Sequence, residues 1–185
     1  MMIFTANPSR AIAAAVSAVV SFAICAADTN VRHYALPEHG FLELEVPRGW
    51  NEIVRRSVDT MAPTIVFGPV EGLPFEISVS PSSNKRTEGG KRSTRERVEQ
   101  YLEGIKPRAV ETDIELVTIE SPNGRGDYFS ATDKSPQPGD YKFLTHGEFD
   151  TDGLAITFTI LSLDGQQQIV RDALAMVRAA RRAPK

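Results

Sequence analysis

Four residues in the C-terminal third carry side chains that suit a metal site or a hydrolase: His146, Glu148, Asp150 and Asp152. Imidazole and carboxylate groups bind metal ions, and a histidine beside a carboxylate is a common general acid–base pair. In a strand, His146 and Glu148 point to the same face. The opposite, core-facing positions hold the aromatic residues Tyr141, Phe143 and Phe149. Because the cluster lacks zinc-type spacing, we expect solvent-facing side chains and turn-forming aspartates, with no metal and no cofactor.

A hydrolase-type enzyme remains the alternative, with a site that assembles in space around His146 and either Asp150 or Asp152. A buried, concave pocket around His146 with a shifted pKa would favour that alternative. A flat, exposed His146 would favour a protein without catalytic activity. No Gly-x-Ser-x-Gly or His-Glu-x-x-His pattern supports a hydrolase.

The densest basic stretch lies between residues 85 and 97. It contains six cations, partly balanced by Glu88 and Glu96: Lys85, Arg86, Lys91, Arg92, Arg95 and Arg97. Such a stretch is either a solvated connector or a surface for an anionic partner, such as a lipid headgroup or an acidic protein face. The candidate binding residues are Arg86, Lys91, Arg92 and Arg95. Arginines near a helix N-terminus oppose the helix dipole, so we do not expect them to stabilise the helix.

An integrin-type tripeptide, Arg125-Gly126-Asp127, follows the turn residues Pro122-Asn123-Gly124. A chance match in a turn that leads into a strand is the simpler interpretation. The pair Gly124 and Gly126 also lacks the third glycine and the following helix of a phosphate-binding loop.

Alternating apolar residues predict the strands that must position these groups. We expect strands at residues 41–46, 64–67, 75–80, 114–119, 127–132, 141–149 and 154–163. Asp150-Thr151-Asp152-Gly153 predicts a tight hairpin between the last two strands. Trp50, which follows the turn Pro47-Arg48-Gly49, is expected to anchor the core at a strand start.

Two helices complete the pattern. Ser93 and Glu96 form a capping box before a helical apolar face of Val98, Tyr101, Leu102 and Ile105, which ends near Gly104 and Pro107. Asp164 is expected to cap the last helix. That helix has an apolar stripe of Ile169, Val170, Ala173, Leu174 and Val177, and it has Arg178, Arg181 and Arg182 at its end. The order predicts an α+β domain, an antiparallel sheet of about six to seven strands flanked by two main helices.

The N-terminal residues indicate export. Residues 1–27 contain the single charge Arg10 and an apolar run, residues 11–23, that is too short to span a bilayer. Cys25 and Ala27 suit the −3 and −1 positions of a signal peptide that is cleaved before Asp28. The alternative, a lipoprotein that begins at Cys25, requires a small residue where Ile24 stands. We therefore expect a signal peptide at 1–27 and a single domain at 28–185, periplasmic or secreted.

Charge and composition narrow the function of the mature chain. Without Arg10, 20 basic residues remain against 24 acidic ones, a net charge of −4 that argues against a nucleic-acid binder. Cys25 is the only cysteine, so its removal excludes disulfides and thiol chemistry. The mature chain contains no further long apolar run, so we expect no transmembrane segment in it.

Three segments resemble PsbP-like (DcrB-like) secreted domains. These are the Leu-x-Leu-x-Val-Pro-x-Gly-Trp segment at 42–50, the Phe-x-Ile-x-Val strand at 75–79, and the hairpin with its helix at 141–182. The resemblance implies an antiparallel sheet flanked by helices. The family includes secreted bacterial proteins, accessory proteins of photosystem II, a GTPase-binding protein and effector chaperones, and it implies no catalytic residues here. We therefore expect a non-enzymatic binding or accessory protein of the bacterial envelope, whose partner is an envelope or secreted protein or an anionic surface.

Overall fold

The computed structural model describes residues 28–37, 39–56, 58, 61–83 and 93–184. The predicted signal peptide at 1–27 lies outside these residues. So do three of the four candidate binding residues, Arg86, Lys91 and Arg92.

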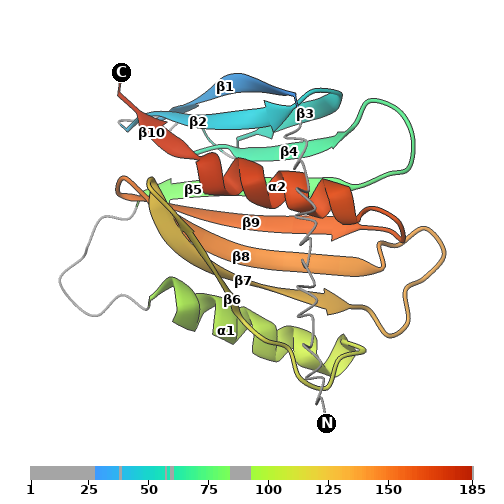
Figure 1. The fold of residues 1–185 in the computed structure, drawn as a ribbon. Helices are drawn as coiled ribbons and strands as arrows, with labels where there is room; N and C mark the ends of the chain where they lie inside the picture. The colour runs from blue at the N-terminus through green and yellow to red at the C-terminus, as the bar shows by residue number, and fades with distance from the viewer. Residues whose placement is uncertain (1–27, 38, 57, 59–60, 84–92, 185) are drawn as a thin grey trace, which may run out of the picture.

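The described residues form ten strands and two α-helices (Figure 1). The strands are β1 (Thr29–Leu36), β2 (Gly40–Pro47), β3 (Trp50–Arg55), β4 (Thr64–Pro69), β5 (Glu76–Ser83), β6 (Val117–Ser121), β7 (Gly124–Thr132), β8 (Phe143–Thr151), β9 (Leu154–Ser162) and β10 (Arg181–Ala183). The helices are α1 (Thr94–Ile105) and α2 (Gln167–Ala179), and a 3-10 turn, Lys106–Arg108, follows α1. Neither helix in this part of the chain is long and apolar enough to cross a membrane.

The strands form two antiparallel sheets. The main sheet has seven strands in the order β3-β4-β5-β9-β8-β7-β6, and the small sheet has the order β1-β2-β10. The α+β class and the size of the main sheet agree with the sequence prediction. The small sheet was not predicted, because the segment at 41–46 was assigned to the main sheet. It is instead the central strand β2 of the small sheet, with a neighbour from each end of the described chain.

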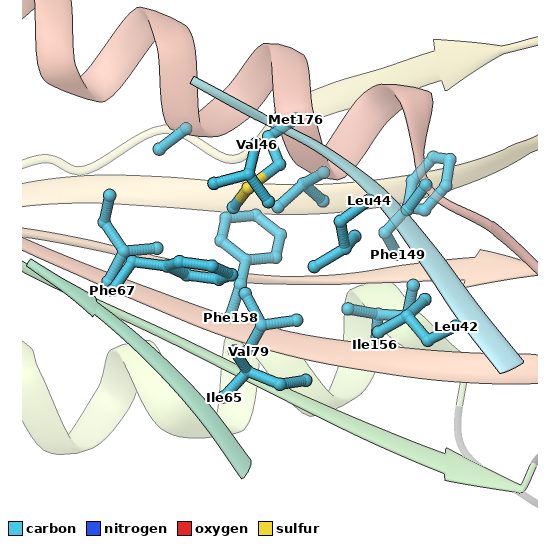
Figure 2. Close-up of a cluster of buried hydrophobic side chains, with 14 of the residues drawn as sticks. Leu42, Leu44, Val46, Ile65, Phe67, Val79, Phe149, Ile156, Phe158 and Met176 are labelled. Atoms are coloured by element: carbon cyan, nitrogen blue, oxygen red, sulfur yellow. The ribbon is translucent and has the colours of Figure 1, made fainter. Parts of the chain in front are cut away.

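The main core lies between the small sheet with α2 and one face of the main sheet (Figure 1). Leu42, Leu44 and Val46 of β2 are fully buried. In Figure 2, Val46 lies beside Met176, and Leu42 lies beside Ile156. Burial of each such side chain contributes about 1.5–3 kcal/mol to folding. Trp50 is buried at the start of β3, as predicted.

A second core lies on the opposite face of the main sheet, under α1. Val98 and Leu102 of α1 pack against Phe129 and Ala131 of β7. The predicted capping box is present: the Ser93 N–H donates to Glu96 Oε2 at 2.7 Å, and the Glu96 N–H donates to Ser93 Oγ at 3.2 Å. Both faces of β7 and β8 are therefore covered.

The hairpin prediction at residues 150–153 is confirmed. Asp152 and Gly153 have φ of 45° and 79°, as a two-residue turn between β8 and β9 requires. The strand predicted at 114–119 begins later, at Val117, although Ile114 is buried in the second core. The predicted cap of α2 is wrong. Asp164 pairs with Lys142 at 2.9 Å, and the helix begins beyond it, at Gln167.

Glycines allow the β6–β7 hairpin to curl tightly over the main sheet. A Cβ on Gly126 would lie 2.1 Å from the carbonyl oxygen of Glu148. A Cβ on Gly147 would lie 2.5 Å from the Cβ of Tyr128. In Figure 1, β6 crosses in front of β7 and β8 toward the C-terminal end of α2. This curl brings the edge of the main sheet next to α2.

Candidate functional site

His146 lies between α1 and the sheet, and the prediction of a solvent-facing position is wrong. Its residue is 7% exposed, and its ring stacks on Tyr101 of α1 with the ring centroids 3.8 Å apart. Nδ1 of His146 lies 2.9 Å from the Thr159 hydroxyl oxygen. Burial lowers the pKa of His146 to about 4. The alternation of the strand correctly placed His146 and Phe149 on opposite faces of the sheet. However, α1 covers the face of His146, which we expected to be exposed to solvent.

The acidic residues near His146 have other contacts. Asp150 lies 3.9 Å from Arg97, and Asp152 lies in the β8–β9 turn. The hydrogen-bond partner of His146 Nδ1 is a hydroxyl group and not a carboxylate. Within the described ranges, no group of three or more His, Cys, Asp or Glu side chains is placed to hold a metal ion. His146 is thus a packed residue of the α1 interface, with no carboxylate bound to its Nδ1.

Ion pairs join α1 to the sheet through two arginines of the basic stretch. Arg97 Nε lies 2.5 Å from Glu148 Oε2, while Arg95 lies 3.1 Å from Glu99 and 3.6 Å from Asp127. Burial raises the pKa of Glu148, against the opposing effect of the Arg97 charge. Contrary to the sequence expectation, Arg95 and Arg97 support α1. They do so through the sheet beneath the helix and not through its dipole.

Arg95, the one candidate binding residue within the described ranges, lines a hollow of about 430 Å³ beside α1. Three carboxylates, those of Glu99, Glu103 and Glu115, also line this hollow. These acidic neighbours do not favour an anion at this place.

The Arg-Gly-Asp tripeptide lies within β7. Asp127 is buried, and its Oδ1 accepts a hydrogen bond of 2.9 Å from the Thr118 hydroxyl. Arg125 lies 3.6 Å from Glu120 on the neighbouring strand. An integrin-type ligand needs both charges on an exposed loop, so the interpretation as a chance match agrees with this placement.

An open groove of about 650 Å³ lies between α2 and the outermost strand β6. Arg171, Leu174, Ala175 and Arg178 form its α2 wall at positions i, i+3, i+4 and i+7, which lie on one side of a helix. The other wall comes from β6 and β7: Val117, Thr118, Ile119, Glu120, Arg125 and Tyr128. The helical spacing was visible in the sequence, but nothing in the sequence indicated that β6 would lie opposite.

Positive charge dominates the groove. Glu120 is its one acidic residue, and Arg125 neutralises that carboxylate at 3.6 Å. The Arg171 guanidinium donates to the Gln168 side-chain oxygen, at 2.6 Å from Nη2. Among the described residues, the exposed Arg178 side chain has no hydrogen-bond or ion-pair partner. The groove therefore offers two guanidinium groups that no carboxylate of the described chain neutralises.

Hydrogen bonds fix one end of the groove. Asn123, in the β6–β7 turn, donates from Nδ2 to the Ala179 carbonyl oxygen at 3.1 Å. The Thr151 hydroxyl donates to the Asn123 carbonyl oxygen at 2.8 Å. These contacts hold the C-terminal end of α2 against the hairpin, so the groove walls keep their separation at that end.

The overall fold of the chain is similar to that of a solved structure. The chain superimposes on the solution structure of cyanobacterial PsbP (CyanoP) from Synechocystis sp. PCC 6803, with a TM-score of 0.51 over 86% of this chain and 95% of that chain. The fold is PsbP-like. Because the sequence identity is 12%, the similarity to PsbP concerns the fold alone.

A crystal structure from Bacteroides thetaiotaomicron VPI-5482 is also similar, with 13% identity and a TM-score of 0.48 over 78% of this chain. The chain spans 46% of the length of that protein. No protein-family model and no curated protein matches the sequence.

Proposed function

We propose that this chain is a non-catalytic binding protein of the bacterial envelope, which binds an anionic partner in the α2–β6 groove. The observation that carries the proposal is the pair of guanidinium groups, Arg171 and Arg178, on one wall of an open groove with apolar residues between them. Guanidinium groups form strong, directional hydrogen bonds with carboxylate and phosphate groups. The apolar residues add contact area that does not depend on charge.

A non-catalytic role is supported by the surroundings of His146. Its ring is packed against Tyr101 and Phe129, and it lines neither of the two hollows described above. A general base needs to reach a substrate proton, and these aromatic neighbours occupy the space beside the imidazole. The hydrolase alternative would require α1 to move away.

The proposed export is supported by the N-terminal sequence and by the position of β1. Asp28 is the residue that would follow the cleavage site, and its carboxylate lies 2.6 Å from Arg48. A chain cleaved before Asp28 keeps every described strand and helix, because β1 begins at Thr29. We expect intact-mass analysis of the envelope fraction to give a chain that begins at Asp28. A chain lipidated at Cys25, or an uncleaved precursor, would contradict this part of the proposal.

The groove is tested with a short fluorescent peptide in which valine and glutamate alternate. We expect the double variant Arg171→Gln, Arg178→Gln to bind this peptide at least about thirtyfold more weakly, because each of the two lost charged hydrogen bonds costs about 1 kcal/mol or more. Exposed charges contribute little to stability, so its melting temperature should remain close to that of the wild type.

A matched control is the variant Arg55→Gln, Arg56→Gln, which makes the same charge change at the opposite edge of the main sheet. A third variant with serine at residues 86, 91, 92 and 95 tests the basic stretch, the other proposed anionic surface. Equal binding by the groove variant and the control would refute the groove as the binding site. A loss confined to the third variant would move the site to the basic stretch.

A further inference from the structure

β6 is the outermost strand of the main sheet and lines the groove. It pairs with β7 through all five residues in regular register and, among the described residues, has no strand on its other side. Alternate residues of an antiparallel edge strand direct their backbone N–H and C=O groups away from the sheet. β6 contains no proline or lysine, the residues that commonly protect such an edge. The groove therefore contains a row of backbone donors and acceptors that another strand can use.

From this geometry we infer that the partner in the groove is an acidic protein segment in extended conformation, which adds to β6 as a further strand. This inference rests on the proposed function and specifies the class of its partner. Strand addition takes its affinity from main-chain hydrogen bonds and its specificity from pockets for alternate side chains.

The charges in the groove indicate which segment fits. Arg171 and Arg178 are seven residues apart on α2, which places them roughly 10 Å apart along the helix axis. Side chains on one face of a strand repeat about every 7 Å, so a segment with glutamate or aspartate at alternate positions presents several carboxylates within the groove, where the two flexible arginines lie. Val117, which is 44% exposed, and Leu174 provide an apolar surface between the two arginines.

A second copy of this chain is a poorer partner for the same edge. β6 has one acidic side chain, Glu120, which lies beside Arg125. Edge-to-edge pairing of two copies would bring two sets of groove arginines close together, and these like charges would repel one another. Charge complementarity thus favours a foreign acidic strand.

The experiment compares two forms of the valine–glutamate peptide. One has an ordinary backbone, and the other carries N-methyl groups on alternate residues, prepared in both registers. N-methylation removes strand hydrogen bonds and leaves the side-chain charges unchanged. We expect both methylated peptides to bind more weakly than the ordinary peptide. The peptide whose methyl groups face the β6 edge should bind at least tenfold more weakly. We also expect the ordinary peptide to slow hydrogen exchange at alternate β6 amides in NMR spectra, with no such change in β3.

The outcomes separate this inference from the proposed function. Equal binding of ordinary and methylated peptides, still dependent on Arg171 and Arg178, would overturn strand addition and leave an anion-binding groove. If the protein bound vesicles with anionic headgroups but bound neither peptide, strand addition would also be overturned. Loss of arginine dependence would refute the groove itself. A dimer that forms without peptide and protects the same β6 amides would assign the edge to a second copy of the chain.

Discussion

At the scale of single residues, His146 shows what the alternation of side chains along a strand can predict and what it cannot. Alternation placed His146 and Glu148 on one face and Phe149 on the other, and the structure has this arrangement. Alternation does not reveal whether a helix covers the polar face. Here α1 covers that face, and its Arg97 supplies the partner of Glu148. The capping box and the tight hairpin were predictable because each depends on residues within four positions of one another.

We expect His146 to make the fold sensitive to mild acid. Its pKa is about 4 in the folded chain, against 6.5 when unperturbed, because burial favours the neutral imidazole. A lowered folded pKa means that stability is fully present above pH 6.5 and is lost as the pH falls from 6.5 toward 4. Near pH 5 the loss from this residue is about 2 kcal/mol.

Urea unfolding of the wild type and of His146→Gln at pH 7 and pH 5 measures this contribution. Glutamine is uncharged at both values and is able to keep a hydrogen bond with Thr159, so the variant should lose about 2 kcal/mol less on acidification than the wild type. Other titrating groups cancel in the difference. Equal acid-induced losses in the two proteins would show that His146 is not held neutral by its surroundings.

At the scale of elements, the strands that were predicted are those with strong alternation. Three strands were missed, β1, β3 and β10, although Trp50 was expected at a strand start. β10 has three residues and pairs with β2 across about 140 positions of sequence. No local pattern encodes such a pairing. The same limit applies to the groove, since the helical stripe of α2 was readable and the curl of the β6–β7 hairpin beside it was not.

The curl depends on glycine, and Gly126→Ala should therefore destabilise the fold. A Cβ at this position would lie 2.1 Å from one backbone atom of β8 and 2.7 Å from another. Backbone atoms within a sheet cannot move aside without breaking the β7–β8 pairing, so we expect a loss of about 2 kcal/mol or more in the free energy of unfolding.

Gly104→Ala is the matched control for this substitution. Gly104 lies in α1, and a Cβ there meets no atom within 4 Å. Alanine should raise the free energy of unfolding by up to about 1 kcal/mol, because it is the better helix former. Opposite signs for the two variants in urea unfolding would support the role of Gly126 in the curl, whereas a neutral Gly126→Ala would contradict it.

At the scale of the whole molecule, the small sheet joins the two ends of the described chain on either side of β2. Truncation after Ala180 removes β10 and the ion pair of Arg181 with the buried Glu43. The hydrogen bond from Arg181 is the main cause that lowers the pKa of Glu43. We expect the truncation to lower the free energy of unfolding by about 2 kcal/mol, because a buried carboxylate loses its arginine partner and keeps only its contact with His33.

A control truncation after Ala183 retains β10 and its pairing with β2. Thermal unfolding of the two shortened chains should separate them by several degrees, with the chain that ends at Ala183 close to the wild type. Similar melting temperatures for both would indicate that β10 contributes little to the fold.

The position of β2 between the first and last strands also sets an order of events during biosynthesis. β2 meets β1 as soon as residues 29–47 have emerged, but its other neighbour lies at residues 181–183. A chain that emerges N-terminus first, from a ribosome or from a translocation channel, keeps one edge of β2 open until residues 181–183 have passed. Completion of the small sheet therefore requires that the chain has emerged as far as Ala183, and a shorter nascent chain retains an open strand edge of the kind that chaperones and proteases recognise.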